Sequence, residues 1–251
     1  MGEKVNILGV GIDKMTVQGA SDQILSWISD ENGQTRAVYT PNSEIVMMAY
    51  RDHTLRDMLN RADMCTADGI GVVYASKIVK NPLGQRAAGY DIACALLQKL
   101  GGRGGSVYLF GAKPGVAEAA GREMAARYPG LQIAGCADGY FDGEKEQAII
   151  ADINYQRPDV LLVCLGAPKQ ERWIDQNRDK ITAKVCMGLG GSLDVFAGTV
   201  KRAPVLFQKL GLEWLYRLCK EPRRIVRMMD LPRFGITVLL HGKQYPQEGK
   251  K

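Results

Sequence analysis

The residue best suited to acid–base chemistry is Asp68. A short apolar segment ends at this carboxylate, and two glycines, Gly69 and Gly71, come before a segment with helical spacing at 72–79. Ligands of open α/β sheets collect where strands end and helices begin, because helix N-termini offer unpaired N–H groups there. A carboxylate in that place can accept a proton from a substrate. The alternative is that Asp68 only caps the following helix, and spacing alone does not decide between the two.

Two other turns resemble this one and carry polar side chains. Thr40 and Asn42 follow one apolar segment, and Gln170 follows another. Right-handed crossovers place the carboxyl ends of parallel strands on one edge of a sheet. We therefore predict that the three turns converge on one site, in which Asp68 does the chemistry. Arg86, in a loop, could neutralise phosphate charge there, although a single loop arginine is more often solvated.

A third kind of turn, Phe110 to Gly115, follows a strand-like segment and opens a helical one. Its backbone N–H groups, around Gly111 and Gly115, could bind a diphosphate. The turn is neither a G-x-G-x-x-G fingerprint nor a P-loop, so an ordinary strand-to-helix connection explains it equally well. The sequence contains no D-x-D and only two histidines, His53 and His241, and we predict neither a metal site nor a cofactor.

Composition places the chain among globular proteins without a membrane span. Of the 251 residues, 46% are hydrophobic and 24% are charged, which is ordinary for such proteins. The apolar runs have the length of strands, the N-terminus does not resemble a signal peptide, and the six cysteines are scattered without a C-x-x-C pair. We therefore expect a cytoplasmic protein with reduced cysteines.

The positive charge is concentrated in the C-terminal region. Residues 198–251 hold 12 Lys and Arg against 4 Asp and Glu, whereas the preceding residues hold 21 against 23. Such asymmetry predicts an anionic partner, either a membrane or a nucleic acid. Arginines interleaved with Trp214 and aliphatic residues favour a helix that lies on an anionic bilayer; a solvated basic face is the other alternative.

The elements that must position these residues alternate between strands and helices of roughly 10–15 residues, which predicts a parallel, doubly wound sheet. We predict a Rossmann-like α/β catalytic domain over residues 1–195, then a basic, amphipathic helical appendage over 196–251, with helical spacing at 203–220. The predicted strands are 4–9, 36–40, 64–67, 106–110, 131–136, 159–165 and 184–189, with a possible hairpin return at 11–17. The predicted helices are 18–29, 43–60, 72–79, 90–100, 114–128, 145–155 and 170–181.

Four motifs occur in order along the chain. They are Thr-Pro-Asn (40–42), Thr-Ala-Asp-Gly (66–69), Gly-x-Pro-x-Gln-Glu (166–171) and Gly-Gly-Ser-Leu-Asp-Val-Phe-Ala-Gly-Thr-Val-Lys-Arg-Ala-Pro (190–204). Together they resemble the WecG/TagA/CpsF family of glycosyltransferases, over nearly the whole chain.

The resemblance implies an inverting, metal-independent transfer of N-acetylmannosamine, or a related sugar, from its UDP donor. The implied acceptor is undecaprenyl-diphosphate-linked N-acetylglucosamine at the inner face of the cell membrane, where the protein would be peripherally bound. The resemblance makes Asp68 the catalytic residue. It implies that the residues binding the substrate are Thr40, Asn42, Arg86 and Gln170, and that those holding the acceptor diphosphate are Arg217, Arg224 and Arg227.

Other functions compatible with the residues are a nicotinamide- or other nucleotide-dependent enzyme on the same sheet, and a basic nucleic-acid-binding module. We favour the glycosyltransferase, which does not need a nucleic acid partner. The sequence leaves open the exact sugar, the polymer that receives it (a teichoic acid linkage unit or similar), and whether the chain forms a homo-oligomer.

Overall fold

The computed structural model of the chain describes residues 2–30, 33–209, 212–220 and 229–247. Its centre is a six-stranded sheet in the order β4-β3-β8-β7-β5-β6, in which every pairing is parallel. The strands are β3 (Arg36–Tyr39), β4 (Met64–Cys65), β5 (Ser106–Gly111), β6 (Gln132–Ala137), β7 (Val160–Cys164) and β8 (Val185–Gly188). The predicted parallel, Rossmann-like sheet is confirmed.

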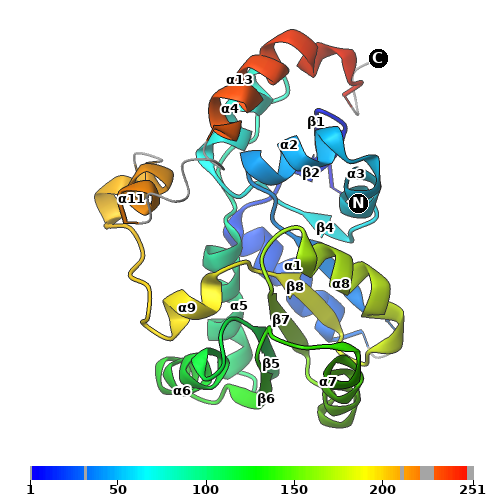
Figure 1. Cartoon of the computed structure of the whole chain (residues 1–251), viewed down its shortest axis with the longest axis vertical. Coiled ribbons are helices and arrows are strands. Elements are labelled where there is room, and N and C mark those ends of the chain that lie inside the picture. The colour runs from blue at the N-terminus through cyan, green and yellow to red at the C-terminus, as the bar shows by residue number, and fades with distance from the viewer. Residues whose placement is uncertain (1, 31–32, 210–211, 221–228, 248–251) are drawn as a thin grey trace.

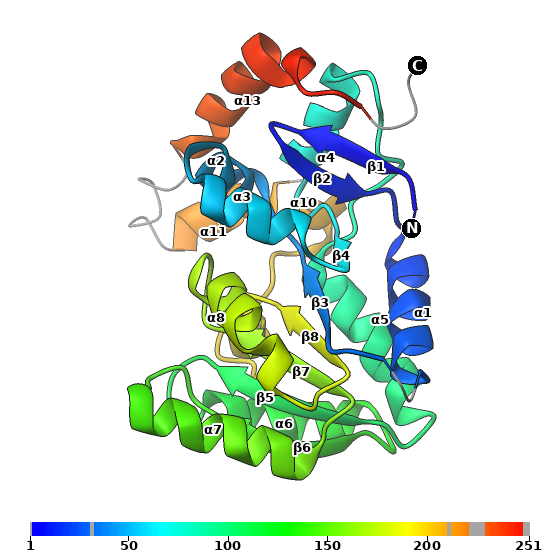
Figure 2. The ribbon, with the colours of Figure 1, turned by 90° about the vertical axis from the view of Figure 1, so that its right-hand side faces the viewer.

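Helices cover both faces of this sheet, because successive side chains of a strand point to opposite faces. In β5, Val107 and Leu109 belong to one hydrophobic core, and Tyr108 and Phe110 belong to the other. Figure 2 shows α1 and α5 on one side of the sheet and α8 on the other. The first face carries α1 (Val17–Ile28), α5 (Gly89–Gly101) and α6 (Val116–Arg127), and the second carries α7 (Gly143–Gln156) and α8 (Lys169–Asn177).

The N-terminal residues form a separate hairpin of β1 (Lys4–Ile7) and β2 (Val10–Asp13), paired antiparallel. The single helix predicted over 43–60 is wrong, because the chain forms α2 (Ser43–Arg51) and α3 (His53–Asn60). Asp52 separates them with an extended backbone (φ −116°, ψ 102°), and its carboxylate accepts the N–H groups of Thr54 and Leu55. The Asp52 side chain competes with backbone carbonyl groups for these N–H donors, so it ends one helix and caps the start of the next.

The C-terminal residues add helices but no strand within the described part of the chain. After α9 (Ser192–Phe196), the helical residues predicted over 203–220 fall in two pieces, α10 (Val205–Lys209) and α11 (Glu213–Lys220). Next comes α13 (Asp230–His241), which lies within the predicted helical appendage although its bounds were not predicted. Short 3₁₀ turns lie at Arg178–Lys180 and Gly242–Gln244.

The helix α13 packs against the body of the protein, beside α2 and α4 (Ile70–Ile78), as Figure 1 shows. Phe234 and Val238, one helical turn apart, are 3% and 0% exposed. Beyond this helix, the amide of Gln247 donates to the carbonyl of Asn6 at 2.9 Å. Among the described residues, no helix combines the length and the apolar character that crossing a bilayer requires.

Candidate active site

Two of the three predicted turns lie side by side at the carboxyl edge of the sheet, because β3 and β4 are neighbours. The N–H of Thr66 donates to the carbonyl of Tyr39 at 3.0 Å, and the N–H of Asp68 donates to the carbonyl of Pro41 at 3.1 Å. These bonds continue the pairing of the strands beyond their ends. They bring the turn that carries Asn42 next to the turn that carries Asp68.

Asp68 is not the N-cap residue of the helix that follows it. That position belongs to Gly69, whose φ of +106° lies in the region that favours glycine. Asn42, by contrast, is the N-cap of α2, and its side-chain oxygen accepts the N–H of Ile45 at 3.0 Å. Its oxygen therefore has a structural task whatever else the side chain binds.

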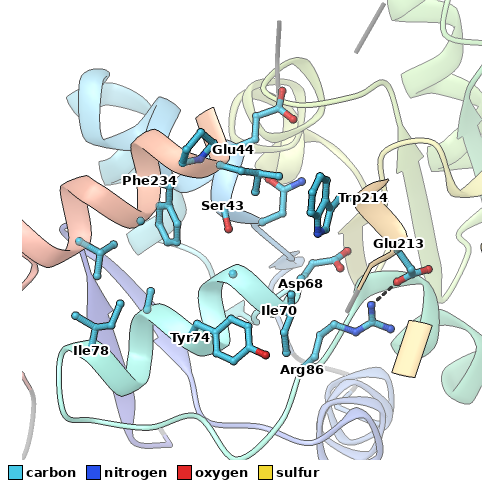
Figure 3. Close-up of a pocket in the computed structure, with 18 residues that line it drawn as sticks. Ser43, Glu44, Asp68, Ile70, Tyr74, Ile78, Arg86, Glu213, Trp214 and Phe234 are labelled. Carbon is cyan, nitrogen blue, oxygen red and sulfur yellow. Dashed lines mark hydrogen bonds and ion pairs between the residues drawn. The ribbon is translucent and has the colours of Figure 1, made fainter. Parts of the chain in front are cut away.

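Asp68 lines a cavity of about 620 Å³, together with Asn42 and Arg86. In Figure 3, Asp68 lies at the same end of this cavity as Arg86, Glu213 and Trp214. Apolar and aromatic side chains of α4 and α13 also line the cavity; these are Ile70, Tyr74, Ile78, Leu231, Phe234 and Val238. In Figure 3, Ile70 lies beside Asp68, whereas Ile78 and Phe234 lie toward the other end. The cavity thus has Asp68 and Arg86 at one end and mainly apolar side chains toward the other, with Glu44 on its rim. Its size is that of an ordinary ligand site.

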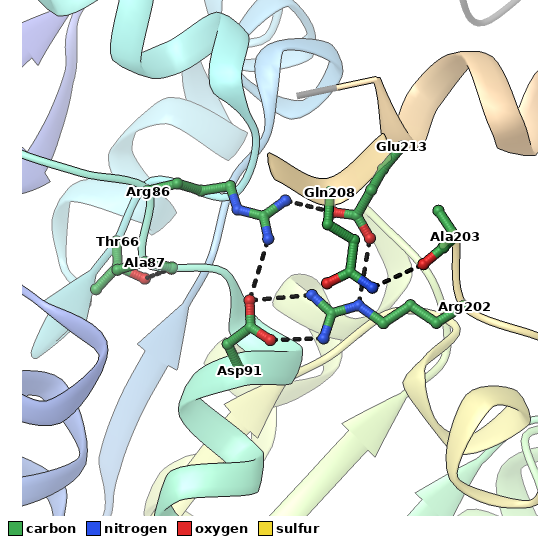
Figure 4. A network of polar contacts seen from close by, with 8 residues as sticks. All are labelled: Thr66, Arg86, Ala87, Asp91, Arg202, Ala203, Gln208 and Glu213. Atoms are coloured by element: carbon green, nitrogen blue, oxygen red, sulfur yellow. Dashed lines mark hydrogen bonds and ion pairs between the residues drawn. The ribbon is translucent and has the colours of Figure 1, made fainter. Parts of the chain in front are cut away.

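The loop that carries Arg86 is fastened to the turn that carries Asp68. The hydroxyl of Thr66 donates to the carbonyl of Ala87 at 3.0 Å (Figure 4), and the N–H of Ala87 donates to the carbonyl of Ala67, also at 3.0 Å. Thr66 is completely buried. Arg86 is therefore held beside the Asp68 turn by backbone geometry as well as by charge.

Arg86 belongs to a ring of four charged side chains that ties the C-terminal region to the sheet (Figure 4). Its guanidinium donates to the carboxylate of Glu213 and to Asp91, the latter at 3.1 Å. Arg202 donates to both oxygens of Asp91, at 2.6 and 3.0 Å, and to Glu213 at 3.3 Å. Two cations and two anions thus alternate, and their side chains are 16% to 30% exposed.

The ring shifts the pKa values of Arg86 and Glu213. Burial favours the neutral form of Arg86, but Glu213, Asp68 and Asp91 hold the pKa of this guanidinium above its ordinary value. Burial also acts against the ionised form of Glu213, yet Arg86 and Arg202 keep the pKa of that carboxyl below its ordinary value. The Arg86 guanidinium therefore stays positively charged next to Asp68 at any physiological pH, within a ring whose charges balance.

The predicted nucleotide-binding turn borders a second cavity, of about 770 Å³, at the same edge of the sheet. Gly111 ends β5 with a φ of +129°, and a Cβ there would lie 2.3 Å from the carbonyl oxygen of Cys164. Gly115 is the N-cap of α6, with a φ of +82°. Side chains that line this cavity include Lys113 and Lys169. The cavity is thus lined by two residues of this turn, Ala112 and Lys113, and its charged side chains are two lysines and two aspartates, Asp142 and Asp194.

Similarity to known proteins agrees with this geometry. The profile of the glycosyl transferase WecG/TagA/CpsF family matches residues 5–248. The chain belongs to this family of glycosyltransferases.

Similar proteins within the family come from Staphylococcus aureus. The protein of strain MRSA252 is 38% identical over 231 residues, and those of strains MW2 and NCTC 8325 are 37% identical over the same length. Each match spans 92% of this chain and 90% of the relative. All three relatives are N-acetylglucosaminyldiphosphoundecaprenol N-acetyl-beta-D-mannosaminyltransferases. The family does not favour the nicotinamide-dependent enzyme or the nucleic-acid-binding module.

The residues predicted to bind substrate in this glycosyltransferase fall into two groups. Asn42 and Arg86 line the cavity with Asp68, whereas Thr40 and Gln170 do not. Thr40 packs under the start of α5, where a Cβ on Gly89 would lie 2.6 Å from its hydroxyl. The turn that carries Gln170 follows β7 on the same edge of the sheet, but none of its residues lines this cavity.

Gln170 connects two loops inside the protein. It is 4% exposed, its side-chain oxygen accepts the N–H of Gly190, and its side-chain nitrogen donates to Glu171, both at 2.8 Å. Burial raises the pKa of Glu171, against the opposing effect of the bond from Gln170. As the side chains lie, Gln170 orders the loop after β8.

The C-terminal arginines predicted to hold the acceptor diphosphate lie outside the described part of the structure. Arg224 and Arg227 belong to residues 221–228, and the side chain of Arg217 is not described although its backbone is part of α11. These three assignments stay predictions.

Neither Glu213 nor the apolar wall of α13 was predicted from the sequence to belong to the site. Trp214 was predicted only to belong to a helix that lies on an anionic bilayer. One signal was available, since Phe234 and Val238 have the i, i+4 spacing of a buried helical face. No local pattern indicates which surface that face covers.

Proposed function

We propose that this glycosyltransferase moves N-acetylmannosamine from UDP-N-acetylmannosamine to undecaprenyl-diphosphate-linked N-acetylglucosamine. The observation that carries the proposal is the cavity in which Asp68 lies beside Arg86 and Asn42 at the carboxyl edge of the sheet. The names of the S. aureus relatives supply the sugar and the acceptor. The product would be a β-linked disaccharide on the lipid, for a cell-surface polymer such as the teichoic acid linkage unit.

In this mechanism, Asp68 acts as the general base. Its carboxylate takes the proton of the acceptor's sugar hydroxyl while the hydroxyl oxygen attacks the anomeric carbon of the donor. The bond from that carbon to the UDP oxygen breaks in the same step, so an α-linked donor gives a β-linked product. UDP leaves with its bonding electron pair as an additional negative charge on the diphosphate.

Fixed hydrogen-bond donors and a fixed positive charge would stabilise the leaving diphosphate. Arg86 carries a permanent charge beside Asp68, and its pKa is raised further by its carboxylate neighbours. The turn from Gly111 to Gly115, at the start of α6, would contribute backbone N–H groups to the nucleotide in the second cavity. Preorganised donors of this kind stabilise charge that develops in a transition state. Thr40 and Gln170 would support the donor site.

The two parts of the chain would divide the work. Residues 1–195 contain every described strand and Asp68, and would act as the catalytic domain. Residues 196–251, with their excess of Lys and Arg, would bind the acceptor diphosphate through Arg217, Arg224 and Arg227. They would also hold the protein peripherally on the anionic inner face of the cell membrane.

The test is a transfer assay with UDP-N-acetylmannosamine and a lipid-diphosphate-linked N-acetylglucosamine, in which UDP release and the disaccharide lipid are both measured. Asp68→Asn should lower turnover on the order of 10²–10⁴-fold, because the amide cannot accept the proton, and should leave UDP binding intact. The control is Asp179→Asn, since the Asp179 side chain is 88% exposed. Near-normal turnover of the Asp68 variant would refute the mechanism, and absence of transfer by the wild type would refute the substrate assignment.

A further inference from the structure

The apolar end of the active-site cavity is a groove between two helices. Its α4 side is formed by Ile70, Tyr74 and Ile78, which lie one helical turn apart, and its α13 side by Leu231, Phe234 and Val238. From Ile70 to Ile78 the helix rises about 12 Å. The groove is therefore elongated, and one end of it reaches Asp68 (Figure 3).

Small residues keep this groove open. Gly235 lines it from α13, and a Cβ on Gly235 would meet no atom within 4 Å. Ala75 lines it from α4. Glycine in the middle of a helix costs about 1 kcal/mol relative to alanine, so a helix that only had to cover the core would gain from a larger residue at this position.

Two aromatic side chains that line the cavity are open to solvent, although Phe234 and Val238 in its wall are buried. Tyr74 is 55% exposed and Trp214 is 38% exposed, although both line a concave site. Apolar surface that stays open in a hollow marks a place where another apolar group binds. The charged end contains Asp68, Arg86 and Asn42, so the complete cavity matches a ligand that is polar at one end and a hydrocarbon at the other.

We infer that the groove between α4 and α13 binds the first isoprene units of a polyprenyl-diphosphate acceptor. The hydrocarbon chain lies along Ile78, Tyr74 and Ile70, so that the diphosphate follows beyond Ile70 and the sugar comes to Asp68. The inference rests on the proposed function and adds a site for the lipid part of the acceptor. Such a groove lets the enzyme select the lipid-linked sugar over a free one, and it fixes the direction in which the acceptor enters.

Binding alone tests this inference without turnover. Farnesyl diphosphate should change the fluorescence of Trp214 and bind at least about 100-fold more tightly than inorganic diphosphate, because each buried methylene contributes a factor of about four. Trp214→Phe identifies which of the tryptophans responds. Equal affinity for farnesyl diphosphate and inorganic diphosphate would overturn the inference.

Variants then locate the bound chain. Gly235→Phe places a ring in the open space of the groove, and should remove most of the preference for farnesyl diphosphate; Gly235→Ala should remove less of it. Gly143→Phe is the matched control, since a Cβ on Gly143 also meets nothing within 4 Å and this residue starts α7. Far-UV circular dichroism and UDP binding check the fold of each variant. If Gly235→Phe does not fold, Tyr74→Ser, at an exposed side chain, tests the same wall.

The transfer assay separates the two proposals. Wild-type enzyme should use an acceptor with a farnesyl chain at least about 10-fold more efficiently, in kcat/KM, than one with a methyl group on the diphosphate. Gly235→Phe should reduce this ratio toward one. Unchanged preference in this variant would overturn the groove while leaving the proposed function standing. Absence of transfer to either acceptor, with farnesyl diphosphate still bound, would instead refute the proposed function.

Discussion

Replacement of Glu213 by glutamine tests the ring of charges that holds the C-terminal region against Arg86. The change keeps the size of the side chain and removes one negative charge from the ring of two guanidinium groups and two carboxylates. Loss of one partner from a buried ion pair costs about 3–5 kcal/mol, and an exposed pair contributes about 0–1 kcal/mol. Since Glu213 and Arg86 are 16% and 19% exposed, we expect a cost of about 1–3 kcal/mol.

Hydrogen exchange of α11 measures this cost directly, because Glu213 is the first residue of that helix. A loss of about 1–3 kcal/mol corresponds to roughly 5- to 150-fold faster exchange of its protected amides if they exchange by local opening. Glu123→Gln is the matched control, since Glu123 is an exposed residue of α6 outside the ring. Exchange in α11 that is equally fast in wild type and Glu213→Gln would refute the view that the ring anchors this helix.

The pH dependence gives a second check with a defined sign. Burial acts to raise the pKa of Glu213, but the bonds from Arg86 and Arg202 lower it overall. A carboxyl whose pKa falls on folding contributes stability that is fully present above its unfolded pKa, about 4.5, and is lost as the pH falls through the lower folded value. The difference in stability between wild type and Glu213→Gln should therefore be complete at pH 7 and shrink below about pH 4.5. A difference that grows in acid would contradict this assignment.

Three further outcomes are expected. EDTA should not abolish transfer, because the chain has no D-x-D; activity lost to EDTA and restored by Mg²⁺ or Mn²⁺ would show a metal requirement. The triple variant with lysine at Arg217, Arg224 and Arg227 should still bind anionic vesicles in a sedimentation assay but lose transfer activity, because lysine lacks the forked donors that match phosphate. Full activity of this variant would leave these arginines only a role as membrane charge. Gly111→Ala should lower the free energy of unfolding by about 2–4 kcal/mol, because its Cβ would lie 2.3 Å from a carbonyl oxygen. Chemical denaturation measures this loss, with Gly143→Ala as the control. Unchanged stability would mean that β5 and β7 separate at this point at little cost.

Local sequence was sufficient for the sheet and for the place of Asp68. Short apolar segments that alternate with amphipathic helices are typical of a parallel sheet with both faces covered, and strand ends then gather on one edge. Asn42 and Asp68 meet there because β3 and β4 pair directly. The same reasoning failed at Asp52, where a side-chain bond to two backbone N–H groups outweighed a continuous helical pattern.

What only the tertiary structure decided is the composition of the cavity around Asp68. Glu213 reaches Arg86 across 127 residues of sequence, and Phe234 completes a wall that begins on α4. Gln170, in a turn that resembles the other two, instead bonds inward to Gly190. Periodicity reports which face of a helix is buried, but the partner of that face depends on how distant helices pack, and side-chain hydrogen bonds depend on distances of a few tenths of an ångström. Those distances arise only once the chain has folded, because no local pattern along the sequence encodes them.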